Sequence, residues 1–227
     1  MERTARRTGW TIAGLVLLFV LIQGFVWHSA SRGTLGLSGN PAAIERLVGP
    51  QVSLLALFAH MVSGALVTLL SVVQLAGPIR QRWPHVHRIS GRVLAVMALL
   101  TGVGGLIYIA LSGTVGGPLM SMGFGVYGVL MITAAIQTPR LAMARDYARH
   151  RRWGLRLIVL GLGSWLYRLH YGLWYGITCT IGEQTCGLAA EPDFSGLFDQ
   201  IQVFAFYAPY LLALEWWLRR APAPIRT

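Results

Sequence analysis

Six long apolar runs constrain this chain more than any other feature. They cover residues 10–27, 51–77, 91–112, 118–137, 153–179 and 197–218. A helix needs about 20 mostly apolar residues to cross the hydrocarbon core of a bilayer, and each run is close to or above that length. Because lipid offers the backbone no hydrogen-bond partner, such runs are expected to cross as helices. The sequence therefore predicts an all-α, polytopic bundle of six transmembrane helices, with residues 1–227 forming a single membrane domain.

The balance of apolar and charged residues supports this class. Hydrophobic residues make up 55% of the 227 residues and charged residues only 12%, which is more apolar surface than a soluble core of this size could cover. The formal net charge of +11 would suggest nucleic acid in a soluble protein, but topology and anionic lipid headgroups account for it here. We expect no nucleic-acid partner. We also expect the first run to be kept as a helix, because it lacks the cleavage pattern of a signal peptide.

The arginines alternate with the predicted helices in a way that indicates topology. Four groups would share one side of the membrane: Arg3, Arg6 and Arg7; Arg80, Arg82, Arg88 and Arg92; Arg140, Arg145, Arg149, Arg151 and Arg152; Arg219, Arg220 and Arg226. The opposite loops carry only Arg32 and Arg46. Short loops rich in arginine stay in the cytoplasm. The pattern predicts a multi-pass protein of the bacterial inner (cytoplasmic) membrane, with both termini inside.

Two cysteines lie together in the last predicted outer loop. Cys179 and Cys186 share this segment with the acidic residues Glu183, Glu191 and Asp193. Close thiols in an oxidising compartment form disulfides, so the sequence predicts a Cys179–Cys186 bridge. The alternative is a pair of unpaired thiols near the membrane surface.

Two histidines inside apolar runs are the best candidates for chemistry. His60 and His170 each lie about six residues from the outer end of their helix, which is about 9 Å at 1.5 Å per residue. Paired imidazoles at matched depth suit a b-type haem or another bound metal. Gly64 and Gly163 would let a flat macrocycle approach the backbone, and Arg168 would lie near a propionate. This arrangement predicts a cofactor site between the second and fifth helices.

These residues leave several functions open. The leading hypothesis is an electron-transfer or quinone-reactive subunit that carries haem b. In a second, His60 and His170 are packing or proton-relay residues of a non-redox lipid-binding or accessory subunit, with membrane lipid or another membrane subunit as its partner. A third is a metal-dependent membrane hydrolase that uses His28, His60, His170 and Asp199. Whether the chain is an enzyme is not decided by these patterns.

Basic residues of the predicted cytoplasmic loops form a second candidate site. The set comprises His87, Arg88, Arg92, His150, Arg151, Arg152 and Arg156. Such a cationic surface could bind phospholipid headgroups, a quinone head or an anionic partner, and its alternative role is only to set topology. Two ion pairs are also expected near the membrane boundaries, Arg168 with Asp199 and Glu215 with Arg219.

The same residues carry a resemblance to a known family. The chain resembles the bacterial membrane family catalogued as domain of unknown function 2306 over residues 52–175. The matching positions are His60, Gly64, Gln74, Arg80, Pro84, His87-Arg88, Gly91-Arg92, Gly123-Phe124, His150-Arg151-Arg152-Trp153, Arg156 and Arg168. Gly154 departs from the pattern, since the family usually has Met there. The resemblance implies a polytopic fold and supplies no activity.

The predicted topology can be tested with reporter fusions. Fusions at Thr114 and Glu183 are expected to give the outside signal, because both positions lie in loops poor in arginine. Alkaline phosphatase and green fluorescent protein fusions report the two sides in parallel. A cytoplasmic signal at either position would contradict the six-helix arrangement.

Overall fold

Every regular element in the described part of the chain is a helix. The structure is a computed structural model that describes residues 2–44, 49–181, 194 and 196–220. The long helices are α1 (Glu2–Leu37), α3 (Gln51–Leu75), α5 (Pro84–Ser112), α6 (Gly117–Met143) and α7 (Tyr147–Ile181). Shorter ones are α2 (Pro41–Ile44), α4 (Gly77–Arg82), α8 (Leu197–Ala205) and α9 (Ala208–Arg220). The predicted all-α class is confirmed. Cys186 lies outside the described residues, so the disulfide with Cys179 stays a prediction.

Five segments are long and apolar enough to cross a membrane. They are Thr11–Leu37, Gln51–Leu75, Pro84–Ser112, Gly117–Met143 and the combined segment Leu197–Arg220. Among the described residues α7, the expected fifth crossing, does not join them, because Arg156, Arg168 and His170 lower its mean hydropathy. The polytopic membrane class is therefore supported. The count of six crossings and the orientation stay predictions.

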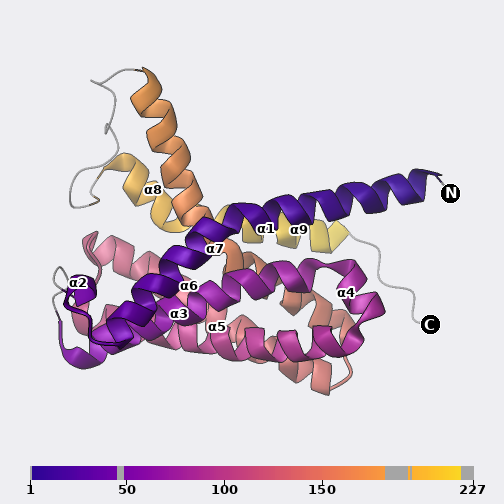
Figure 1. Ribbon diagram of the computed structural model, residues 1–227, viewed down its shortest axis with the longest axis horizontal. Coiled ribbons are helices and arrows are strands. Elements are labelled where there is room, and N and C mark those ends of the chain that lie inside the picture. Colours follow the sequence, from indigo (N-terminus) through magenta and orange to yellow (C-terminus); the bar gives the residue numbers. More distant parts are fainter. Residues whose placement is uncertain (1, 45–48, 182–193, 195, 221–227) are drawn as a thin grey trace.

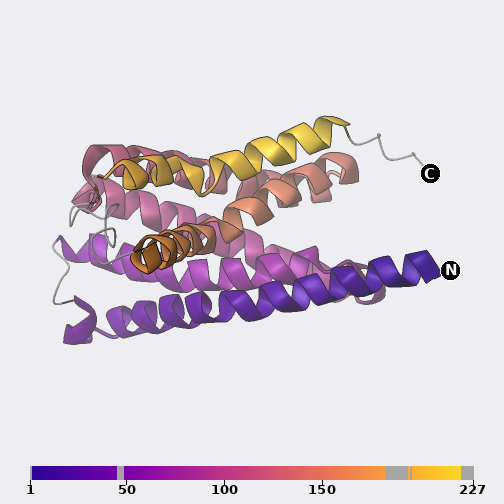
Figure 2. The ribbon, with the colours of Figure 1, turned by 90° about the horizontal axis from the view of Figure 1, so that it is seen from above.

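The helices form a bundle whose two ends differ in charge. α1 begins and α9 ends at one end of the bundle (Figures 1 and 2). We call this the arginine-rich end, because α4, the α6–α7 turn and the end of α9 bring to it Arg80, Arg82, Arg145, Arg149, Arg219 and Arg220. The opposite end is called the far end. In Figure 1, α7 crosses the other long helices steeply, and its orange C-terminal part projects away from them.

Small residues extend the first helix and bind it to the bundle. The predicted helix ends at residue 27, but α1 continues to Leu37. A Cβ placed on Gly33 would lie 2.6 Å from Cγ2 of Val62 and 2.9 Å from the carbonyl oxygen of Phe58. The polar and small residues that end the apolar run thus form the face that packs against α3. The third predicted helix also begins earlier, because Pro84 can occupy the first turn of α5.

Glycines allow the central helices to approach closely. A Cβ on Gly104 would lie only 2.8 Å from the carbonyl oxygen of Ala56 in α3. A Cβ on Gly102 would lie 3.1 Å from the carbonyl oxygen of Gly128 in α6. In lipid, small residues at such contacts gain packing that larger side chains would block. Gly102 and Gly104 are therefore packing sites between α5 and its neighbours.

The last predicted helix is broken at its most buried point. α8 ends at Ala205 and α9 begins at Ala208, and Phe206 and Tyr207 between them are almost entirely buried. The Phe206 ring lies 4.9 Å from Tyr127, 5.2 Å from Phe124 and 5.3 Å from Tyr167, measured between ring centroids. This aromatic cluster joins the break to α6 and α7.

A single added methyl group should separate α3 from α5. Gly104→Ala places a Cβ against a backbone oxygen that cannot move aside, so we expect a loss of about 1–3 kcal/mol in the free energy of unfolding. Gly125→Ala is the matched control, since a Cβ there meets nothing within 4 Å. Thermal unfolding in detergent should show a lower midpoint for the first variant only. Equal midpoints would contradict the close contact.

Candidate functional site

His60 of α3 faces α5, and one of its ring nitrogens is hydrogen-bonded there. Its Nδ1 donates a hydrogen bond to the carbonyl oxygen of Thr101 at 2.7 Å. The Thr101 hydroxyl in turn donates to Oγ of Ser63 and to the carbonyl oxygen of Met97, both at 2.8 Å. A Cβ on Gly105 would lie 3.0 Å from Nδ1 of His60, so the missing side chain makes room for the ring. These contacts hold the imidazole in one orientation, with Nε2 as its unprotonated nitrogen.

A small cavity lies beside His60, and most of its lining is apolar. It has a volume of about 50 Å³, and its polar lining comes from His60, Thr101, Tyr127 and Ser164 on four different helices. A water molecule fits such a space and finds hydrogen-bond partners there. Cofactor sites are much larger, about 300–1,000 Å³. The cavity can therefore hold water or a very small ligand next to His60.

His170 is held by the last two helices. Its Nδ1 lies 3.1 Å from Oε1 of Gln202 in α8, and its Nε2 lies 2.7 Å from the hydroxyl of Tyr210 in α9. The rings of His170 and Tyr210 also stack, with centroids 5.9 Å apart. Both ring nitrogens are thus engaged. Within the described residues no hydrogen bond joins His170 to His60, and the two histidines have partners on different helices.

Asp199 is the most unusual polar group near His170. Its side chain is 0% exposed, and the hydroxyl of Tyr171 donates a hydrogen bond to Oδ1. The hydroxyl of Tyr167 lies 3.4 Å from that of Tyr171, and Nε2 of Gln202 donates to the carbonyl oxygen of Tyr167 at 3.4 Å. Oδ2 of Asp199 is the buried side-chain atom without a partner in the described part of the chain. We call Tyr167, His170, Tyr171, Asp199, Gln202 and Tyr210 the far-end cluster.

Several members of this cluster could have been found from spacing alone. Tyr167, His170 and Tyr171 are three and four residues apart, which places them on one face of a helix. Asp199 and Gln202 are also three apart in α8. The sequence does not show that this face of α7 and this face of α8 pack against each other. Polar side chains on one face of an apolar run are the signal that sequence reasoning did not use.

The other residues of the predicted haem site have different neighbours. Nη1 of Arg168 donates to the carbonyl oxygen of Ser164 at 3.2 Å, and its guanidinium lies 4.8 Å from the centroid of Phe25 in α1. The expected Arg168–Asp199 ion pair is therefore wrong. A Cβ on Gly163 would meet the Tyr127 ring at 2.9 Å, and one on Gly64 would lie 3.6 Å from Cγ2 of Thr101. Both glycines accommodate protein side chains.

The basic residues at the arginine-rich end are partly committed to protein contacts. Nδ1 of His150 donates to the carbonyl oxygen of Thr138 at 2.9 Å, and Nε of Arg88 donates to that of Pro84 at 3.3 Å. The backbone carbonyl of His87 accepts from Nε2 of Gln74 at 3.1 Å. Arg151 lies over the ring of Trp217, with its guanidinium carbon 5.5 Å from the ring centroid. Arg92 and Arg152 complete the predicted surface, and Arg152 is exposed.

Arg156 forms a two-armed ion pair that ties α7 to α9. Its Nε donates to Oε1 of Glu215 at 2.6 Å, and its Nη2 donates to Oε2 at 3.0 Å. The guanidinium also lies 4.6 Å from the centroid of Trp153. The expected Glu215–Arg219 pair is therefore wrong, because Glu215 pairs with Arg156. A bidentate pair of this kind neutralises Arg156 and makes it a structural contact.

The fold and these contacts define a polytopic α-helical membrane protein with ionisable side chains inside its bundle. The chain matches the family model described as "Predicted membrane protein (DUF2306)" over residues 57–188, more than half of its length, and it belongs to that family. The family resemblance expected from the motif residues is confirmed. No curated protein and no solved structure matches the chain.

The Arg156–Glu215 contact should behave as a structural pair. Arg156→Gln and Glu215→Gln are each expected to lower the free energy of unfolding by about 1–2 kcal/mol, because each leaves a partly buried charge without its partner. The double variant should lose less than the sum of the two. Unfolding midpoints of the four proteins in one detergent measure this coupling. Additive losses would contradict the pair.

Proposed function

We propose that this chain is a quinone-reactive membrane protein whose far-end cluster binds a quinone head and exchanges protons with it. The observation that carries the proposal is the buried carboxyl of Asp199. An unpaired polar atom inside a protein costs about 1–3 kcal/mol, and ionisable residues at membrane depth usually serve a function. Oδ2 of Asp199 is a position where a proton can be accepted or released.

Hydrogen bonds support a route from the lipid-facing surface to this carboxyl. Tyr210 is 37% exposed, and its hydroxyl contacts His170, the side chain in the cluster best suited to proton transfer. Gln202 lies between His170 and the backbone of Tyr167. The hydroxyls of Tyr167 and Tyr171 then lead to Asp199. These bonds form two segments that meet at Tyr167, because Gln202 contacts its backbone carbonyl and only its hydroxyl leads to Asp199. Passage of a proton from His170 to Asp199 therefore requires a side-chain movement that joins the two segments.

The surroundings of the cluster favour a lipid-soluble partner. Exposed apolar side chains flank it on α7 and α8, including Leu173, Ile177 and Ile201. A partner that reaches Tyr210 across this surface must have an apolar body and a polar head that accepts hydrogen bonds. Quinones have both features. Electrons would pass between the quinone and a partner membrane subunit, and this chain would supply the binding and proton contacts.

Two earlier hypotheses receive less support from these contacts. A haem between His60 and His170 does not fit them, because both nitrogens of His170 are occupied and the cavity beside His60 is only about 50 Å³. The hydrolase needs a cluster of ligands, and among the described residues no three His, Cys, Asp or Glu side chains lie together as a metal site would need. We propose neither as the function.

The proposal predicts which side chains a quinone contacts. In nanodiscs, a photoreactive quinone analogue is expected to label peptides of α7, α8 and α9. Tyr210→Phe should weaken binding about tenfold, since losing one hydrogen bond of about 1.4 kcal/mol has that effect. His170→Gln should weaken it less, because both ring nitrogens of His170 already pair with Gln202 and Tyr210 and the imidazole acts by positioning the Tyr210 hydroxyl. His28→Gln is the matched control, because His28 is an exposed histidine of α1. Binding that is equal in all four proteins would overturn the proposal.

Asp199 has a separate test. Infrared difference spectra recorded as quinone is reduced and reoxidised should contain a carboxyl band that disappears in Asp199→Asn. Asp146→Asn, which changes an acidic residue at the arginine-rich end, should leave the band in place. A band that persists in Asp199→Asn assigns proton exchange to another group.

A further inference from the structure

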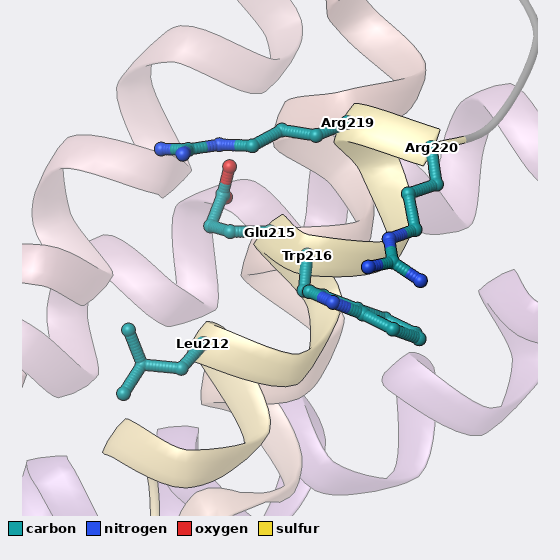
Figure 3. A pocket seen from close by; sticks show the side chains of 5 residues that line it. All are labelled: Leu212, Glu215, Trp216, Arg219 and Arg220. Atoms are coloured by element: carbon teal, nitrogen blue, oxygen red, sulfur yellow. The ribbon is translucent and has the colours of Figure 1, made fainter.

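The pocket at the end of α9 has features that the far-end cluster does not explain. It has a volume of about 280 Å³ and is lined by Leu212, Glu215, Trp216, Arg219 and Arg220 (Figure 3). These residues are separated by three, four, seven and eight positions from Leu212, so they occupy one face of the helix. Figure 3 shows the Arg219 side chain extending past the Glu215 carboxylate and the Arg220 side chain turned toward the Trp216 ring.

The charges around this pocket do not balance. Arg156 takes both carboxylate oxygens of Glu215 through its two hydrogen bonds. Arg152 and Arg219 also act electrostatically on Glu215, but within the described residues neither forms an ion pair with it. Arg220 lies 4.0 Å from the centroid of Trp216, a contact that leaves its positive charge in place. Three guanidinium groups thus act on one carboxylate, and Arg220 adds a further positive charge to the pocket lining, so the excess charge is positive.

The pocket combines this charge with exposed apolar surface. Leu212 is 70% exposed and Trp216 is 57% exposed, although both lie on a helix that is apolar enough to cross a membrane. Tryptophan and arginine together are typical of the boundary between hydrocarbon and headgroups. A ligand that satisfies both parts has a negatively charged head and an apolar tail. Arginine forks match the oxygens of a phosphate especially well.

We infer that this pocket binds the headgroup of an anionic phospholipid, attracted by the positive charge of Arg219 and Arg220, with its acyl chains along Leu212 and Trp216. The site differs from the basic loop surface predicted from the sequence, because it lies on α9 and includes Arg219 and Arg220. It also stands apart from the quinone proposal, since its residues lie at the arginine-rich end and contain no member of the far-end cluster. Failure of one proposal would leave the other intact.

The experiment compares two lipids and two pairs of arginines. Delipidated protein in detergent is titrated with phosphatidylglycerol or phosphatidylcholine, and bound lipid is counted by native mass spectrometry. Wild-type protein should retain phosphatidylglycerol preferentially, and Arg219→Gln/Arg220→Gln should weaken that binding at least about tenfold. Arg80→Gln/Arg82→Gln is the matched control, because it removes the same charge from exposed positions of α4 at the same end. The control should bind within about twofold of wild type.

Folding controls, a lysine variant and a competing ion complete the experiment. Circular dichroism and size-exclusion chromatography establish that the variants fold, and Arg219→Lys/Arg220→Lys keeps the charge without the forked donors, so it should give an intermediate affinity. Equal losses in both glutamine pairs would overturn the site and indicate attraction by net charge alone. Equal binding of the two lipids would also overturn it. Competition by inorganic phosphate at the same concentration as the lipid would identify a site for the free ion and overturn the lipid assignment.

Discussion

Close backbone contact at small residues is the constraint on which the rest of this structure depends. Between helices in lipid there is little hydrophobic driving force, so packing and hydrogen bonds must hold them together. Gly104 brings α5 against Ala56 of α3, and Gly102 brings α5 against Gly128 of α6. Gly161 of α7 leaves room for the side chain of Ser71 in α3. Larger side chains at these positions would separate α3, α5, α6 and α7, which carry His60 and His170.

This closeness also explains why most polar side chains inside the bundle are satisfied. His60 reaches the carbonyl of Thr101, and Thr68 reaches that of Gly161 at 3.1 Å, each across the gap between two helices. Tyr127 donates to the carbonyl of Leu160 in the same manner. Such bonds add directionality to contacts that small residues make possible. Asp199 is the exception, because half of its carboxyl has no partner in the described residues, and it therefore stands out as chemically available.

The two ends of the bundle differ in the partners of their ionisable side chains. At the far end, one buried carboxyl and one histidine have tyrosine hydroxyls and an amide as their hydrogen-bond partners. At the arginine-rich end, Glu215 neutralises Arg156 and Asp146 pairs with Arg149, so carboxylates face guanidinium groups there. α7 connects both ends, and its charged and aromatic residues make it the least apolar of the long helices. Its charged and aromatic side chains mainly contact other helices and not lipid.

The amino-acid sequence by itself determined the helical membrane class and the family. Apolar length, arginine placement and helical spacing are local properties, and lipid allows a backbone few alternatives to a helix. The helix ends were less predictable, since Gly33 and Gly36 look like a loop until α3 packs on them. Only the tertiary structure decided which faces meet. His170 contacts Gln202 and Tyr210 because α7 crosses the bundle steeply and because the chain breaks at Phe206, where the aromatic cluster of α6 and α7 is buried. Helical periodicity predicts on which face of its helix a residue lies. Packing between segments that are distant in the sequence determines which residues it contacts.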